Sequence, residues 1–113
     1  MTNNAPQMAA WDIHHYVPTG DPLSPVDALE AWLAERGVYN PQFFISEWGA
    51  CTPERVAEMK TAFDNDERVL KHFFYDQFAA TWDGDGRCTM LFEEGSEPLR
   101  LSPLGRAFAE EGR

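Results

Sequence analysis

The chain has 113 residues, the size of one ordinary domain. Apolar residues make up 43% of it and aromatic residues 13%, enough for a packed core, which argues against a disordered chain. Nine Lys and Arg against nineteen Asp and Glu leave a net charge of −10, which repels phosphate backbones and anionic lipid. We therefore predict no nucleic-acid partner and no membrane partner.

The N-terminal segment gives no targeting signal. Its first ten residues lack a basic stretch followed by an apolar one, so we expect no signal peptide in this chain. We expect residues 1–8 to be flexible and residues 9–113 to form the folded part. No apolar run approaches the roughly 20 residues of a membrane-spanning helix. Two cysteines, Cys51 and Cys88, are too few for a disulfide scaffold and leave the cellular compartment undecided.

A strand and a helix are predicted first. Ala9–Val17 is an apolar and aromatic run closed by a turn rich in Pro and Gly, as expected of a buried strand. Ser24 and Pro25 are typical of a helix N-cap and of the first helical position, and Gly37 ends the helix. The residues expected to face the core at helical spacing are Val26, Leu29, Trp32 and Leu33.

A second strand, a second helix and a third strand follow. Phe43–Glu47 is apolar on both faces, as strands inside parallel sheets are. Thr52 and Pro53 repeat the cap-and-proline signal of a helix start. The apolar face of this helix is expected to contain Val56, Met59 and Phe63. A third strand is predicted at about His72–Phe78.

The C-terminal third combines turns with one more helix. Trp82–Gly86 is a turn-rich loop, and Thr89–Phe92 with Leu99–Leu101 predict a small hairpin. Ser102 and Pro103 begin a final helix. Strands that alternate with helices in this way predict an α/β fold with a parallel sheet and right-handed crossovers.

Polar side chains gather where the predicted strands end, which is where parallel α/β folds bind their ligands. They are Asp12, His14 and Tyr16 on the first strand, Glu47 on the second, and Asp76 and Gln77 on the third. Strand alternation places Asp12, His14 and Tyr16 on one face and His15 on the other. Adjacent histidines therefore cannot ligate one metal ion, and we predict no metal site and no cofactor.

Three short segments carry a family resemblance. His14-His15-Tyr16, Phe44–Gly49 and Phe73–Gln77 occur in this order at the three predicted strands. Together they resemble the last three strands of a clan A glycoside hydrolase, the (β/α)8-barrel group that includes families 5 and 39. His14 and Tyr16 match a His-x-Tyr of strand six. Ile45–Gly49 matches the acid-aromatic-Gly signature of strand seven, and the likeness extends over about residues 9 to 110.

The resemblance implies a fold and a site. The fold is a partial (β/α)8 barrel, the last three βα units of a retaining enzyme that hydrolyses O-glycosidic bonds in oligo- or polysaccharides. Glu47 takes the position of the catalytic nucleophile. His14 and Tyr16 are implied to hold the nucleophile and the sugar. From their own chemistry, Trp48 and Trp82 are candidates for stacking on sugar rings, and either Gln77 or Asp76 for binding sugar hydroxyls. For Trp48 the alternative is packing in the core, and His15 and His72 are predicted to be structural.

One departure from the family limits what this chain does alone. The family's acid/base Glu, at the end of strand four, has no counterpart here, and a retaining glycosidase needs two carboxyls about 5–5.5 Å apart. We therefore expect the isolated chain to be inactive. We expect its concave face, lined by Phe43, Ile45 and Phe73, and its sheet edges to be covered by a missing N-terminal barrel half or by self-association. The alternative is a non-catalytic domain that binds a saccharide or a protein.

Overall fold

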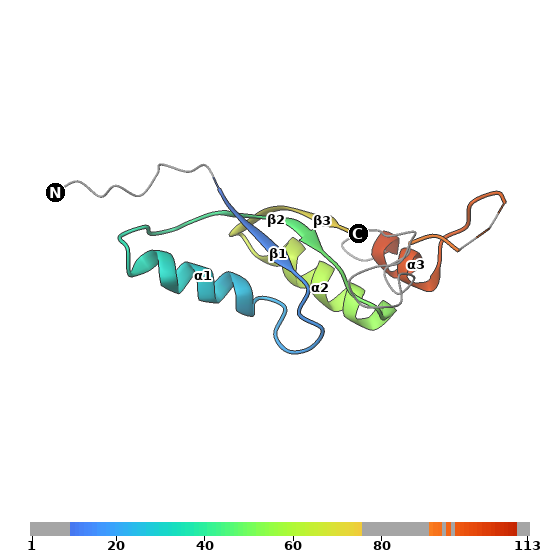
Figure 1. Ribbon diagram of the computed structural model, residues 1–113, viewed down its shortest axis with the longest axis horizontal. Coiled ribbons are helices and arrows are strands. Elements are labelled where there is room, and N and C mark those ends of the chain that lie inside the picture. The colour runs from blue at the N-terminus through green and yellow to red at the C-terminus, as the bar shows by residue number, and fades with distance from the viewer. Residues whose placement is uncertain (1–9, 76–90, 94, 96, 111–113) are drawn as a thin grey trace.

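The computed structural model describes residues 10–75, 91–93, 95 and 97–110 (Figure 1). Its elements are β1 (Trp11–His15), α1 (Ser24–Ala34), β2 (Phe43–Trp48), α2 (Pro53–Asn65), β3 (Val69–Phe74) and α3 (Pro103–Glu110). The strands form one parallel sheet in the order β1-β2-β3, so the predicted α/β pattern is confirmed. The segment predicted to be flexible, residues 1–8, lies outside the described residues.

Both crossover helices pack on one face of the sheet, which we call the helix-covered face (Figure 1). Its strand residues form a single core cluster with buried residues of α1 and α2. The cluster contains Ile13, Phe43, Ile45 and Trp48 from the strands, Val26 and Leu33 from α1, and Val56, Met59 and Phe63 from α2. Because strand order follows chain order and both helices lie on the same side, the sheet is singly wound, unlike a doubly wound sheet with helices on both faces.

The opposite face, which we call the open face, carries exposed side chains from every strand. They are Asp12 and His14 on β1, Phe44 and the partly exposed Glu47 on β2, and Lys71 and Phe73 on β3. Phe73 is 54% exposed, although parallel sheets normally have both faces covered. The prediction that Phe43 and Ile45 share a face with Phe73 is wrong, because both are fully buried against the helices.

Helix α1 differs from its prediction in two details. Leu23, not Ser24, is the N-cap residue, and the carboxylate of Asp21 accepts the Leu23 N–H at 2.9 Å. Trp32 is not a core residue: its side chain is 48% exposed and the Arg36 guanidinium stacks over its ring at 3.6 Å. Gly37, with a φ of 81°, follows the helix as predicted.

Helix α2 and strand β3 meet at a tight turn. The Thr52 hydroxyl caps α2 by accepting the Arg55 N–H at 3.2 Å, as the sequence predicts. β3 begins at Val69, earlier than predicted, because the pairing with β2 already starts where the Phe43 N–H donates to the Arg68 carbonyl at 2.7 Å. His72 therefore lies within the strand, paired with Ile45, and not at its start.

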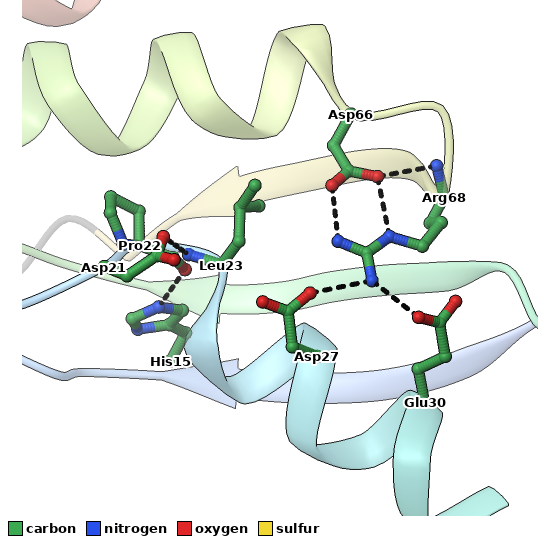
Figure 2. Close-up of polar contacts among 8 residues, drawn as sticks. All are labelled: His15, Asp21, Pro22, Leu23, Asp27, Glu30, Asp66 and Arg68. Carbon is green, nitrogen blue, oxygen red and sulfur yellow. Dashed lines mark hydrogen bonds and ion pairs between the residues drawn. The ribbon is translucent and has the colours of Figure 1, made fainter. Parts of the chain in front are cut away.

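An arginine ties this turn to α1 (Figure 2). The Arg68 guanidinium donates to both carboxylate oxygens of Asp66, at 3.0 and 2.7 Å. A third nitrogen of the group lies 2.8 Å from Asp27 and 3.0 Å from Glu30, both on α1. This cluster lies at the amino-terminal ends of the strands, so it stabilises the end of the sheet opposite to the one that carries Glu47.

The C-terminal segment forms part of the predicted hairpin and the final helix. Phe92 and Leu101 pair in an antiparallel bridge. Ser102 begins α3, as predicted, and its hydroxyl accepts the Gly105 N–H at 3.0 Å. Phe108 of α3 contacts the rings of Phe74 and Trp48. In the described ranges, no helix has the length and apolar character needed to cross a membrane.

Candidate functional site at the carboxyl ends of β1 and β2

The carboxylate of Glu47 meets two side chains from the end of β1. The Tyr16 hydroxyl donates to Glu47 Oε1 at 2.6 Å. His14 Nε2 lies 3.5 Å from Glu47 Oε2. The Glu47 side chain is 34% exposed, so its carboxylate is accessible from the open face. The structure thus brings together three of the predicted site residues.

A bulge in β2 turns Glu47 toward these partners. Phe43 and Ile45 face the helices, and strict alternation would send Glu47 the same way. The register instead pairs Ile13 with Ile45 and His14 with Glu47, which leaves Ser46 as an extra residue. Glu47 therefore faces the open side while the next residue, Trp48, turns back into the core. Strand alternation in the sequence does not predict this bulge.

A fourth polar residue, Asp12, completes the cluster. Its Oδ1 accepts the Ser46 N–H at 3.2 Å, and its Oδ2 lies 3.7 Å from His14 Nε2. The His14 ring therefore lies between the carboxylates of Asp12 and Glu47. In the part of the chain that the structure describes, no group of three His, Cys, Asp or Glu residues is arranged to hold a metal ion.

The electrostatics of the site keep Tyr16 a hydrogen-bond donor. Burial raises the pKa of Tyr16 well above its usual range, and the hydrogen bond to Glu47 and the charge of that carboxylate raise it further. A phenol that does not ionise near neutral pH holds Glu47 Oε1 in place. Glu47 Oε2 lies on the side of His14.

Trp48 lies away from this surface. Its side chain is fully buried, and its ring makes edge contacts with Phe63 and Phe74 at centroid distances of 5.3 and 4.9 Å. Its indole N–H donates to His72 Nδ1 at 3.1 Å, so the His72 Nε2–H donates to Asp64 at 2.6 Å. Trp48 thus occupies the core position that was the alternative to stacking on a sugar.

The loop after β1, which carries Tyr16, is held by hydrogen bonds from Arg55 and His15. Arg55 of α2 donates to the carbonyls of Gly20 and Val17, at 2.7 and 3.0 Å. His15 is buried, and its Nε2–H donates to the Pro22 carbonyl at 2.7 Å (Figure 2). The role of Arg55 cannot be predicted from the sequence, because a single arginine at a helix start carries no signal of the distant carbonyls that it binds.

The remaining predicted site residues, Gln77 and Trp82, lie outside the described residues, as do Asp76 and Cys88. Cys51, which follows β2, is disulfide-bonded.

No protein-family model, no curated protein and no solved structure matches this chain. The features of the chain that bear on function are therefore the site and the arrangement of the sheet.

Proposed function

We propose that Glu47 is the nucleophile of a retaining glycoside hydrolase, to which this chain contributes the last three βα units of a (β/α)8 barrel. One observation carries the proposal. The Glu47 carboxylate lies on the open face at the carboxyl end of a parallel strand, with the Tyr16 hydroxyl 2.6 Å from Oε1. In (β/α)8 barrels, catalytic groups occupy this end of the strands.

The arrangement of the sheet supports the barrel part of the proposal. Helices on the outer face and strands in sequential order are the pattern of a segment of a (β/α)8 barrel. The open face, with Phe44 and Phe73 exposed, corresponds to the inside of such a barrel. In the described sheet β1 and β3 are edge strands, with backbone groups that further strands would pair.

The chemistry proposed for the site is a double displacement. Glu47 Oε2 attacks the anomeric carbon of an oligo- or polysaccharide, the bond to the leaving oxygen breaks, and a glycosyl ester forms. An acid/base carboxyl from a segment outside this chain protonates the leaving oxygen. The same group then takes a proton from water, which hydrolyses the ester. The Tyr16 hydroxyl orients Glu47 throughout, and His14 lies where it can contact the sugar.

The test is covalent trapping of the nucleophile. The native polypeptide that carries this sequence is incubated with a panel of 2-deoxy-2-fluoroglycosyl fluorides, and its peptides are mapped by mass spectrometry. We expect the sugar on Glu47, and a loss of turnover on the order of 10⁵-fold in Glu47→Gln. Glu54→Gln, a substitution in the first turn of α2, is the matched control and should retain activity.

Two results would contradict the proposal. One is a label on a carboxylate other than Glu47. The other is turnover of aryl glycosides by the isolated 113-residue chain that Glu47→Gln abolishes, since the family's acid/base Glu of strand four has no counterpart in that sequence. Saccharide binding by the native polypeptide without turnover or labelling would instead favour the non-catalytic alternative.

A further inference from the structure

We propose that Asp12 is a positioning residue for Glu47: by accepting the Ser46 N–H, it holds the bulge that aims the Glu47 carboxylate at Tyr16. The inference rests on the proposed function for the importance of that aim. Its structural content, the link between Asp12 and the orientation of Glu47, stands on the geometry of β1 and β2 alone.

The register of β2 shifts against both of its neighbouring strands. Toward β1, Ser46 is inserted between the pairs Ile13–Ile45 and His14–Glu47. Toward β3, the register also shifts between Ile45 and Trp48, so that Ser46 and Glu47 together face the single residue Phe73. Without the extra residue, Glu47 would follow the parity of Ile45 and point among the core side chains.

A bulge leaves a backbone group without its regular backbone partner in the neighbouring strand. Here the partner is a side chain of the neighbouring strand. Asp12 Oδ1 accepts the Ser46 N–H at 3.2 Å, while Asp12 Oδ2 lies on the side of His14, at 3.7 Å. One carboxylate thus contacts both the backbone that turns Glu47 and the imidazole that faces it.

Because Asp12 is exposed, its positioning role can be distinguished from a role in core packing. Its side chain is 56% exposed on the open face and contributes nothing to the core cluster. Removing it therefore costs the fold little, whereas the Ser46 N–H loses its partner and the bulge loses its anchor. We expect Glu47 to leave Tyr16 for part of the time.

The experiment follows the contact between Tyr16 and Glu47 and not turnover. The native polypeptide is labelled with ¹³Cζ-tyrosine, and the Tyr16 resonance, assigned from its loss in Tyr16→Phe, is followed while acid protonates Glu47. We expect this resonance to move with acid in the wild type and to stay in place in Glu47→Gln. In Asp12→Ala we expect the movement to fall by more than half.

Three further variants make the result decisive. Asp12→Asn keeps an acceptor oxygen and should retain the movement, while Asp12→Ser is too short to reach Ser46 and should lose it even if Asp12→Ala does not fold. Asp21→Ala is the matched control, because Asp21 also accepts a backbone N–H at an exposed position, that of Leu23. A full movement in both Asp12→Ala and Asp12→Ser, or its loss in a folded Asp12→Asn, would overturn the inference.

The outcome is independent of whether the protein is a glycosidase. If Glu47 is not a nucleophile, the resonance still reports on its orientation, and only the trapping experiment fails. If the native protein is active, Asp12→Ala should lower kcat on the order of 100-fold with KM nearly unchanged, as expected for a misplaced catalytic group. Asp12→Asn should restore most of that loss.

Discussion

Replacing Arg68 by Met tests how much its ion pairs at the amino-terminal end of the sheet contribute to the free energy of unfolding (Figure 2). The substitution keeps most of the apolar stem and removes the guanidinium from a partly buried site. Arg68 is 24% exposed and Asp66 is 11% exposed, so solvent compensates poorly for the loss of their two hydrogen bonds. Asp27 and Glu30, the other two partners, lie nearer the surface.

The expected cost is the sum of one partly buried pair and two exposed ones. Hydrogen bonds to charged groups contribute about 1.5–3 kcal/mol, and we take about 2 kcal/mol for the pair with Asp66, discounted for its remaining exposure. Exposed pairs contribute about 0.5 kcal/mol each. Arg68→Met should therefore lower the free energy of unfolding by about 3 kcal/mol.

Urea unfolding followed by circular dichroism measures this difference in the native polypeptide. Arg100→Met is the matched control, because Arg100 pairs with Glu93 at an exposed position, and it should cost less than about 1 kcal/mol. The contribution of Arg68 to stability should also depend on pH. The Arg68 guanidinium lowers the pKa of Asp66, so its stabilisation is full above the unfolded-state value of about 3.9 and is lost as the pH falls below it.

In Arg68→Met, that loss between about pH 4 and the lowered pKa of Asp66 should be smaller than in the wild type. A cost equal to that of Arg100→Met, or an unchanged pH dependence below pH 4, would refute the assignment of the cluster as a structural clamp.

Two more predictions concern single buried positions. Burial lowers the pKa of His15 below 6.5. In the folded chain, both nitrogens of the neutral ring form hydrogen bonds. As the pH falls, the unfolded chain therefore takes up a proton on His15 before the folded chain does. Stability should fall as the pH drops from about 6.5 toward the lowered folded value, and His15→Gln should flatten the pH dependence of chemical unfolding there; an unchanged slope would contradict this. In α3, a methyl group added at Gly105 would overlap the Leu91 carbonyl oxygen. Gly105→Ala should therefore destabilise by about 1–3 kcal/mol in thermal unfolding, although Ala favours helices over Gly; a higher melting temperature would exclude this overlap.

Local signals in the sequence predicted much of the fold. The Thr52-Pro53 pair marks the start of α2, and Ser102-Pro103 marks the start of α3, because each signal lies within one turn of the helix that it begins. Alternation in β1 correctly separates His14 from the buried His15. These are short-range effects that a single sequence displays.

The pairing of strands that are distant in the sequence could not be predicted from such local signals. The bulge at Ser46 depends on how β2 pairs with two neighbours, and it reverses the face that parity assigns to Glu47. The early start of β3 likewise follows from the bond between Phe43 and the Arg68 carbonyl. Trp32 has the spacing of a core residue, yet the Arg36 guanidinium covers it at the surface.

In the candidate site, too, some residues could be predicted from the sequence, while others depend on the pairing of the strands. The resemblance singled out His14, Tyr16 and Glu47, and the structure brings them together within hydrogen-bonding or ion-pair distance. It also singled out Trp48, whose apolar ring the bulge returns to the core. Asp12 was noted only as a polar residue on the same face, because its bond to the Ser46 backbone exists only at the bulge.

The central claim is that this chain is part of a larger barrel in which Glu47 is the nucleophile. The most direct measurement is the intact mass, from the source cells, of the native polypeptide that contains the peptide around Glu47. The account predicts a polypeptide of about 250 residues or more, as a complete (β/α)8 barrel requires. A native mass of 12.8 kDa would contradict it, since the three strands of the described residues and the one carboxyl proposed as nucleophile complete neither a barrel nor a retaining site.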